Sequence, residues 1–129
     1  MKMQRKVPQM YEEQEAVVVL CKCGEVHKTY DIRAAKIAPR KWSFTWAFPI
    51  KESSAKREGY DKTSIGGDIG FSGEYPGCPY CGQRGFTACS CGHLNCTVLK
   101  NGIFTCEWCG AQGTLEDYTG GAISAGADL

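Results

Sequence analysis

Nine cysteines in a chain of 129 residues limit the fold of this protein more than any other feature. Eight of them stand in pairs separated by one or two residues, and a glycine follows each pair, in the segments 21–24, 78–82, 89–92 and 106–110. Paired cysteines at this spacing are typical of the tetrahedral thiolate sites that Zn²⁺ prefers. The glycine lets the chain turn back with positive φ at low cost. The sequence therefore predicts turns that hold metal.

Disulfide bonding is the alternative use of so many cysteines, and two observations favour metal. The cysteine count is odd. Residues 1–15 contain no apolar segment typical of a secretion signal, and the apolar run 16–20 is too short for a signal or a membrane span. We therefore expect reduced cysteines and a cytoplasmic protein.

The segment 89–110 has a cysteine pair at each end and Asn101-Gly102 between them. Asn-Gly between two β-prone segments is the strongest short-range indication of a β-hairpin. A hairpin here would bring both cysteine pairs to the same end and four sulfurs to one point. The segment thus predicts a zinc ribbon with the ligands Cys89, Cys91, Cys106 and Cys109.

An internal repeat extends this interpretation to the other cysteines. The motif Cys-x-Cys-Gly occurs at 21–24 and 89–92, and Cys-x-aromatic-Cys-Gly occurs at 78–82 and 106–110. The repeat predicts a small, mainly-β fold of tandem zinc ribbons, the first of which carries an insertion over residues 33–77. The ion of the first ribbon would be held by Cys21, Cys23, Cys78 and Cys81, so that the chain binds two structural Zn²⁺ ions.

Cys96 has no cysteine counterpart in this repeat, because it aligns with Lys28. We expect it to be a small buried thiol and Cys96→Ser to be mild. His27 and His93 also align with residues other than histidine, so the repeat predicts surface or outer-shell positions for both.

A rival pairing of the cysteines stays open. It joins the two Cys-x-x-Cys pairs around one ion and leaves the other cysteines for the second ion. The first ion is then held by Cys78, Cys81, Cys106 and Cys109, and the second by Cys21, Cys23 and two of Cys89, Cys91 and Cys96. Both pairings bind two ions through sulfur.

The remaining segments define the domain limits. Residues 1–15 are expected to be a flexible N-terminal segment, 16–118 the double-ribbon domain and 119–129 a flexible Gly/Ala-rich tail. Within the insertion, 51–75 has the composition of a mobile loop. Residues 41–50 place four aromatic side chains at period two, which predicts a strand with one aromatic face, in the core or open to a partner: Trp42, Phe44, Trp46 and Phe48.

The charge pattern and the residue types narrow the functions. The net charge is +1 with acids and bases mixed along the chain, so the basic stripe of many nucleic-acid-binding ribbons is absent from the sequence. No catalytic set or phosphate-binding loop appears, and four thiolates leave no open position on zinc, so we expect no enzyme. A protein-interaction module is favoured; a nucleic-acid-binding ribbon and a redox iron-thiolate protein are the alternatives.

Three segments, 75–82, 85–96 and 105–110, resemble the C-terminal metal-binding domain of TerY-type proteins, which are bacterial and associated with tellurite resistance. The family pattern keeps the cysteine at Cys96, which implies a ligand role for it, and often has proline where this chain has Glu107. The resemblance implies a phosphorylation and stress-response system with a von Willebrand A domain, a protein kinase or a PP2C-type phosphatase as partner. The Asp-x-Ser-x-Ser motif of the von Willebrand A domain is missing, so we expect a free-standing or excised module.

Overall fold

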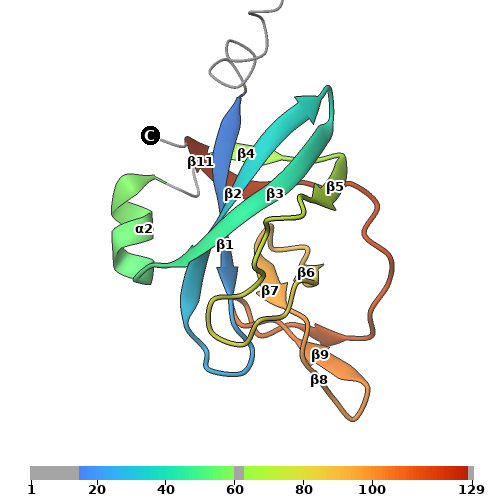
Figure 1. The fold of residues 1–129 in the computed structure, drawn as a ribbon. Coiled ribbons are helices and arrows are strands. Elements are labelled where there is room, and N and C mark those ends of the chain that lie inside the picture. Colours follow the sequence, from blue (N-terminus) through green and yellow to red (C-terminus); the bar gives the residue numbers. More distant parts are fainter. Residues whose placement is uncertain (1–14, 60–62, 128–129) are drawn as a thin grey trace, which may run out of the picture.

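The computed structural model describes residues 15–59 and 63–127 and shows a small, mainly-β fold in which α2 (Glu52–Glu58) is a short helix (Figure 1). The predicted flexible segment 1–15 lies, apart from Glu15, outside the described residues. The strands are β1 (Ala16–Lys22), β2 (Thr29–Ala38), β3 (Lys41–Pro49), β4 (Thr63–Ile65), β5 (Asp68–Phe71), β6 (Phe86–Ala88), β7 (Leu94–Cys96), β8 (Leu99–Lys100), β9 (Ile103–Thr105), β10 (Gln112–Gly113) and β11 (Ile123–Ala127).

The main sheet runs in the order β4-β11-β1-β2-β3-β5. Its two end strands, β4 and β5, are consecutive in the chain and are separated only by Gly66 and Gly67. The sheet therefore curls round on itself, and β4 and β11 pass behind β2 and β3 in Figure 1. Glycine is required at this corner because Gly67 has a φ of +112° and an added Cβ would lie 2.2 Å from the carbonyl oxygen of Arg40.

Two shorter β units carry the C-terminal cysteines. β7 pairs in parallel with the end of β1, and β6 pairs with β7. A separate sheet has the order β10-β9-β8. Between β8 and β9, Asn101 and Gly102 adopt φ values of +54° and +77°, as a tight hairpin turn requires. The hairpin predicted from Asn-Gly is confirmed.

The inner face of the curled sheet forms the hydrophobic core. Every strand of the main sheet except β5 contributes a buried side chain to this core, and several cysteines are part of it. Its members include Val19, Ile32, Phe44, Ile65, Ile123, Cys23, Cys78 and Cys96. Full burial of each large apolar side chain stabilises the fold by about 1.5–3 kcal/mol. Because Cys23, Cys78 and Cys96 pack among these side chains, the main core and not a loop alone positions their thiols.

The prediction that β3 has one aromatic face is wrong, because a β-bulge interrupts the strand. The ladder pairs Arg33 with Trp46 but the next residue of β2, Ala34, with Phe44, so Thr45 is an extra residue. A bulge of one residue reverses which side chains face the core. Phe44 is therefore buried, whereas Trp46 is 53% exposed.

The predicted flexible tail and mobile loop are also corrected. Residues 123–127 of the tail form β11, which pairs with β1 and β4, and Ile123 and Ala125 are fully buried. Alanine and glycine have low strand propensity, but the hydrogen-bond ladder and burial override it. Within 51–75 the described residues include the three regular elements α2, β4 and β5. The ion pair between Lys22 and Glu52 (2.9 Å) ties the start of α2 to β1.

None of the helices in the described part of the chain has the length and apolar character needed to cross a membrane.

Candidate metal centres

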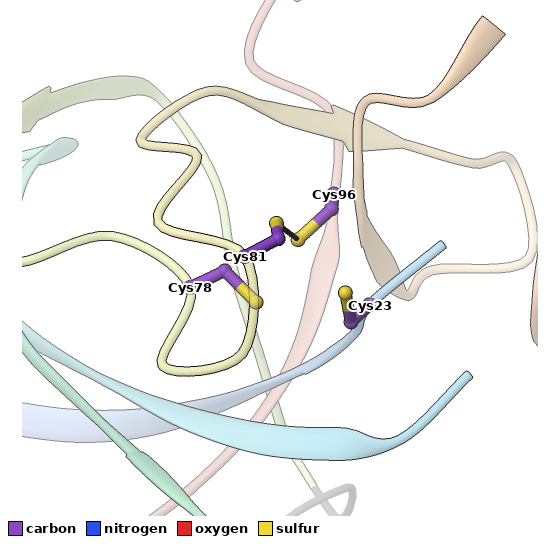
Figure 2. Close-up of side chains that lie close together, drawn as sticks. All are labelled: Cys23, Cys78, Cys81 and Cys96. Carbon is purple, nitrogen blue, oxygen red and sulfur yellow. Dashed lines mark hydrogen bonds between the residues drawn. The ribbon is translucent and has the colours of Figure 1, made fainter. Parts of the chain in front are cut away.

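The structure gathers eight cysteine sulfurs into two clusters of four. In each cluster all four Sγ atoms lie within 4.8 Å of one another. The first centre consists of Cys23, Cys78, Cys81 and Cys96, whose sulfurs converge in Figure 2 from β7, the end of β1 and the loop before β6. The second centre consists of Cys89, Cys91, Cys106 and Cys109.

The sulfur spacings fit a tetrahedral ion. Four thiolates at about 2.3 Å from Zn²⁺ are about 3.8 Å apart along each tetrahedral edge. The Sγ atoms of Cys81 and Cys96 are 3.8 Å apart in the first centre, and those of Cys91 and Cys106 are 3.8 Å apart in the second. The donor set and its geometry therefore suit two metal ions.

The Cys-x-x-Cys pair of each centre is held in a turn with the same hydrogen bonds, which we call the first knuckle (78–83) and the second knuckle (106–111). The amide of Cys78 donates to the carbonyl of Gln83 (2.9 Å), and that of Cys106 donates to the carbonyl of Ala111 (2.8 Å). In both knuckles the glycine amide returns to the first cysteine's carbonyl (2.8 and 2.9 Å), and that glycine has positive φ. The two knuckles predicted from sequence are confirmed as turns.

The aromatic residue of each knuckle anchors it to a neighbouring strand. The hydroxyl of Tyr80 donates to the carbonyl of Thr29 at the start of β2 (2.8 Å). The indole Nε1–H of Trp108 donates to the carbonyl of Leu94 in β7 (2.7 Å). This shared contact explains why an aromatic residue precedes the second cysteine in both motifs: it is long enough to reach the strand and carries a hydrogen-bond donor.

Cys23 lies in a third turn of the same kind that lacks a second cysteine. Its amide donates to the carbonyl of Lys28 (2.8 Å), and the amide of His27 donates to the carbonyl of Cys23 (2.8 Å). Val26 occupies the place that the second cysteine holds in the two knuckles. The left-handed residue is His27, with φ of +60°, and Gly24 is not among the glycines with positive φ. The predicted equivalence of Gly24 and Gly92 is therefore wrong.

Cys96 replaces Cys21 in the first cluster, contrary to the repeat-based prediction. Cys21 lies within β1, where it pairs with Tyr30 of β2, whereas Cys23 lies beyond the end of the strand. Residues i and i+2 of a strand are about 6.6 Å apart, so Cys21 sits deeper in the core on the same side as Cys23. β7, paired with β1, carries Cys96 to the cluster instead, and the hydroxyl of Tyr30 lies 3.2 Å from its Sγ.

The rival pairing is also not the arrangement that the structure shows, because the two knuckles belong to different clusters. The repeat did not identify Cys96 as a ligand because the pairing of β1 with β7 brings Cys96 to the first cluster, and this pairing is not visible in the local motif. The family resemblance, which implied a ligand role for Cys96, was the available indication.

The second centre brings together the four cysteines that the sequence predicted for it. Cys89 and Cys91 lie in the turn between β6 and β7, where the amide of Gly92 donates to the carbonyl of Cys89 (2.9 Å). Because both cysteines are in the turn and not in a strand, both sulfurs reach the same point. The Sγ of Cys89 lies 3.5 Å from that of Cys109.

Each centre contains one thiol whose pKa is lowered. Burial by itself raises the pKa of Cys23, but the backbone amides of Val26 and Glu25 outweigh it. Burial likewise opposes ionisation of Cys106, and the amides of its own knuckle with the side-chain amide of Asn95 lower its pKa to about 7. These two thiols are the first that we expect to ionise and bind a metal ion.

Three further ligand thiols, those of Cys78, Cys91 and Cys96, resist ionisation without an ion. Burial is the main cause that raises the pKa of Cys78, and it raises the pKa of Cys91 to about 12. The hydrogen bond with the thiol of Cys21, followed by burial, raises the pKa of Cys96. A metal ion must displace these protons, so binding releases protons and weakens in acid.

The histidines lie beside the second centre but outside the clusters. His27 Nδ1 lies 2.7 Å from a carboxylate oxygen of Glu107 in the second knuckle. The ring of His93 stacks on that of Trp108 with centroids 4.5 Å apart, and its Nδ1 is 3.9 Å from the sulfur of Cys91. Both positions agree with the outer-shell placement predicted from the sequence.

No family model, curated protein or solved structure compared with this chain matches it.

Proposed function

We propose that this chain is a zinc-stabilised protein-interaction module built from two zinc ribbons that share the strands around β7. The observation that carries the proposal is the pair of four-sulfur clusters with tetrahedral spacing. The cysteines of the first centre are part of the hydrophobic core itself, and a structural Zn²⁺ contributes an apparent ~10–16 kcal/mol to folding.

A structural role for both ions follows from the ligand sets. Four thiolates fill the coordination sphere of Zn²⁺ and leave no position for water or substrate. The knuckle amides of Tyr80 and Trp108, each 3.4 Å from the first sulfur of its knuckle, offset part of the negative charge. Iron could occupy the same sulfurs, so the identity of the ion is part of the proposal.

The outer surface of β3 supports an interaction role. Beyond the bulge, Trp46 is 53% exposed and Phe48 is 36% exposed on the same face. Exposed aromatic side chains of this size are enriched at protein interfaces. By the family resemblance alone, the partner is a von Willebrand A domain, a protein kinase or a PP2C-type phosphatase of a tellurite-resistance system in the cytoplasm.

Native mass spectrometry with elemental analysis tests the metal proposal directly. We expect two zinc ions per chain. A single zinc ion would contradict the proposal of two structural sites. Iron, detected by an absorbance band in the visible, would contradict the zinc proposal and favour the redox alternative.

Binding assays with the wild type and the Trp46→Ser/Phe48→Ser double variant test the interaction role. The purified probes are a TerY-type von Willebrand A domain and a PP2C-type phosphatase, with single-stranded DNA and RNA in parallel. Binding of a protein probe that the double variant loses supports the proposal. Salt-dependent binding of the oligonucleotides alone would favour the nucleic-acid alternative.

A further inference from the structure

β7 lies between the two centres and presents neighbouring side chains to each of them. All of its residues are buried, and successive side chains of a strand point to opposite faces. Cys96 belongs to the first centre. The side chain of Asn95 reaches the second centre, where Nδ2 donates to the sulfur of Cys106 (3.5 Å) and Oδ1 accepts from the amide of Glu107 (2.7 Å).

Further contacts tie the second knuckle to the elements that carry the ligands of the first centre. The carbonyl of Leu94 accepts from the indole of Trp108 (2.7 Å). Lys22, directly before the Cys23 turn, and His27 within that turn also contact the second knuckle: the ammonium of Lys22 lies 4.3 Å from the centre of the Trp108 ring, and His27 Nδ1 lies 2.7 Å from a carboxylate oxygen of Glu107. The second knuckle is therefore bound to β1, β7 and the Cys23 turn together.

We propose that β7 couples the two metal centres, so that an ion in either centre raises the affinity of the other, with Asn95 as the positioning residue. An ion held by Cys96 restrains a strand of only three residues, and this restraint holds Asn95 against the second knuckle. An ion on Cys106 restrains the same strand from the other side. Binding linkage requires the effect to be equal in both directions. The inference goes beyond the interaction role and depends only on metal binding at both clusters.

Three zinc affinities of the full chain measure the coupling. Chelator competition gives the overall binding constant for two ions in the wild type, the constant of the first centre in Cys109→Ala and that of the second centre in Cys81→Ala. Both substituted cysteines are exposed. The overall constant divided by the product of the two single constants is the coupling factor. We expect a factor of about 5–150, the usual range of coupling between sites. A factor of one would overturn the proposal.

Variants that keep all ligands test the route of the coupling and do not depend on folding with one ion. Asn95→Asp keeps the acceptor for the Glu107 amide but loses the donor to Cys106, and His27→Gln removes the imidazole that contacts Glu107. We follow the fraction of singly loaded protein by native mass spectrometry during stepwise zinc removal. Both variants are expected to raise the fraction of singly loaded protein severalfold. The control Lys28→Gln, which changes an exposed side chain in the Cys23 turn, should leave this fraction unchanged. An unchanged fraction in Asn95→Asp would overturn the role of β7.

Discussion

The two centres use the same knuckle but differ in what completes them. The second centre adds a local turn, so its four ligands come from a short stretch of chain, and two of them, Cys91 and Cys109, are exposed. The first centre adds Cys96 from β7 and Cys23 from just beyond the end of β1, the strand that pairs with β7, and three of its four cysteines are buried in the main core. One knuckle motif therefore serves both a surface site and a core site.

This difference shows that the depth of a thiolate site is set by its non-knuckle ligands. A turn can be built anywhere on a surface, whereas a ligand just beyond the end of β1 and one on β7 draw the ion towards the sheet. We therefore expect the first ion to contribute more to the stability of the main sheet and the second to be more open to exchange. The following predictions test this comparison, from the largest expected effect to the smallest.

Exchanging serine for Cys96 or for Cys21 gives the largest contrast. Cys96→Ser should lose one of two ions and most of the stabilisation by that ion, which is of the order of 10 kcal/mol, so its thermal unfolding midpoint should fall sharply. Cys21→Ser should keep both ions. Zinc analysis and thermal unfolding measure both. Loss of an ion in Cys21→Ser with retention in Cys96→Ser would restore the ligand set predicted from the repeat.

The order of metal release should separate the centres. With a limiting amount of chelator, we expect the exposed thiols of the second centre to become reactive before those of the first. Alkylation followed by peptide mass spectrometry should label Cys91 and Cys109 early and Cys23 and Cys78 late. Early labelling of Cys23 would mean that burial does not protect the first ion.

Asp31 should make the sheet around the first centre sensitive to pH. It is fully buried on β2, neither of its carboxylate oxygens has a hydrogen-bond partner among the residues that the structure describes, and burial raises its pKa to about 7. A raised pKa means that the folded state favours the protonated acid. The loss in free energy of unfolding caused by Asp31 therefore grows as the pH rises from about 4, the pKa of an unfolded Asp, to about 7, and is constant above that.

The variant Asp31→Asn isolates this cost. Its advantage over the wild type in free energy of unfolding should be small at pH 5 and reach a few kcal/mol at pH 8. The comparison at each pH removes the common effect of acid on the metal thiolates. An advantage that does not change between pH 5 and pH 8 would show that Asp31 has no raised pKa.

Removal of the Tyr30 hydroxyl should have the smallest effect. Tyr30→Phe keeps the buried ring but loses the hydroxyl that lies 3.2 Å from the sulfur of Cys96. A single net hydrogen bond contributes about 0.5–1.5 kcal/mol, so denaturant unfolding of the zinc-loaded protein should show a loss of that size. Tyr118→Phe, which loses a hydroxyl bonded to Gly121 on the exposed surface, is the control. Equal losses would show that the contact between the Tyr30 hydroxyl and the sulfur of Cys96 contributes nothing specific.

Sequence by itself determined the local chemistry of this protein. The knuckles around Cys78 and Cys106, the Asn101-Gly102 hairpin and the use of most cysteines in two clusters follow from turn geometry and ligand spacing, which act over a few residues.

The tertiary structure decided what depends on distant pairing. The choice of Cys96 over Cys21 follows from the ladder between β1 and β7, and the exposure of Trp46 follows from a bulge that appears only when β2 and β3 are paired. Residues 123–127 form a strand because β1 and β4 supply partners for a segment with little propensity of its own. Strand pairing joins residues far apart in the chain, so no local pattern records it.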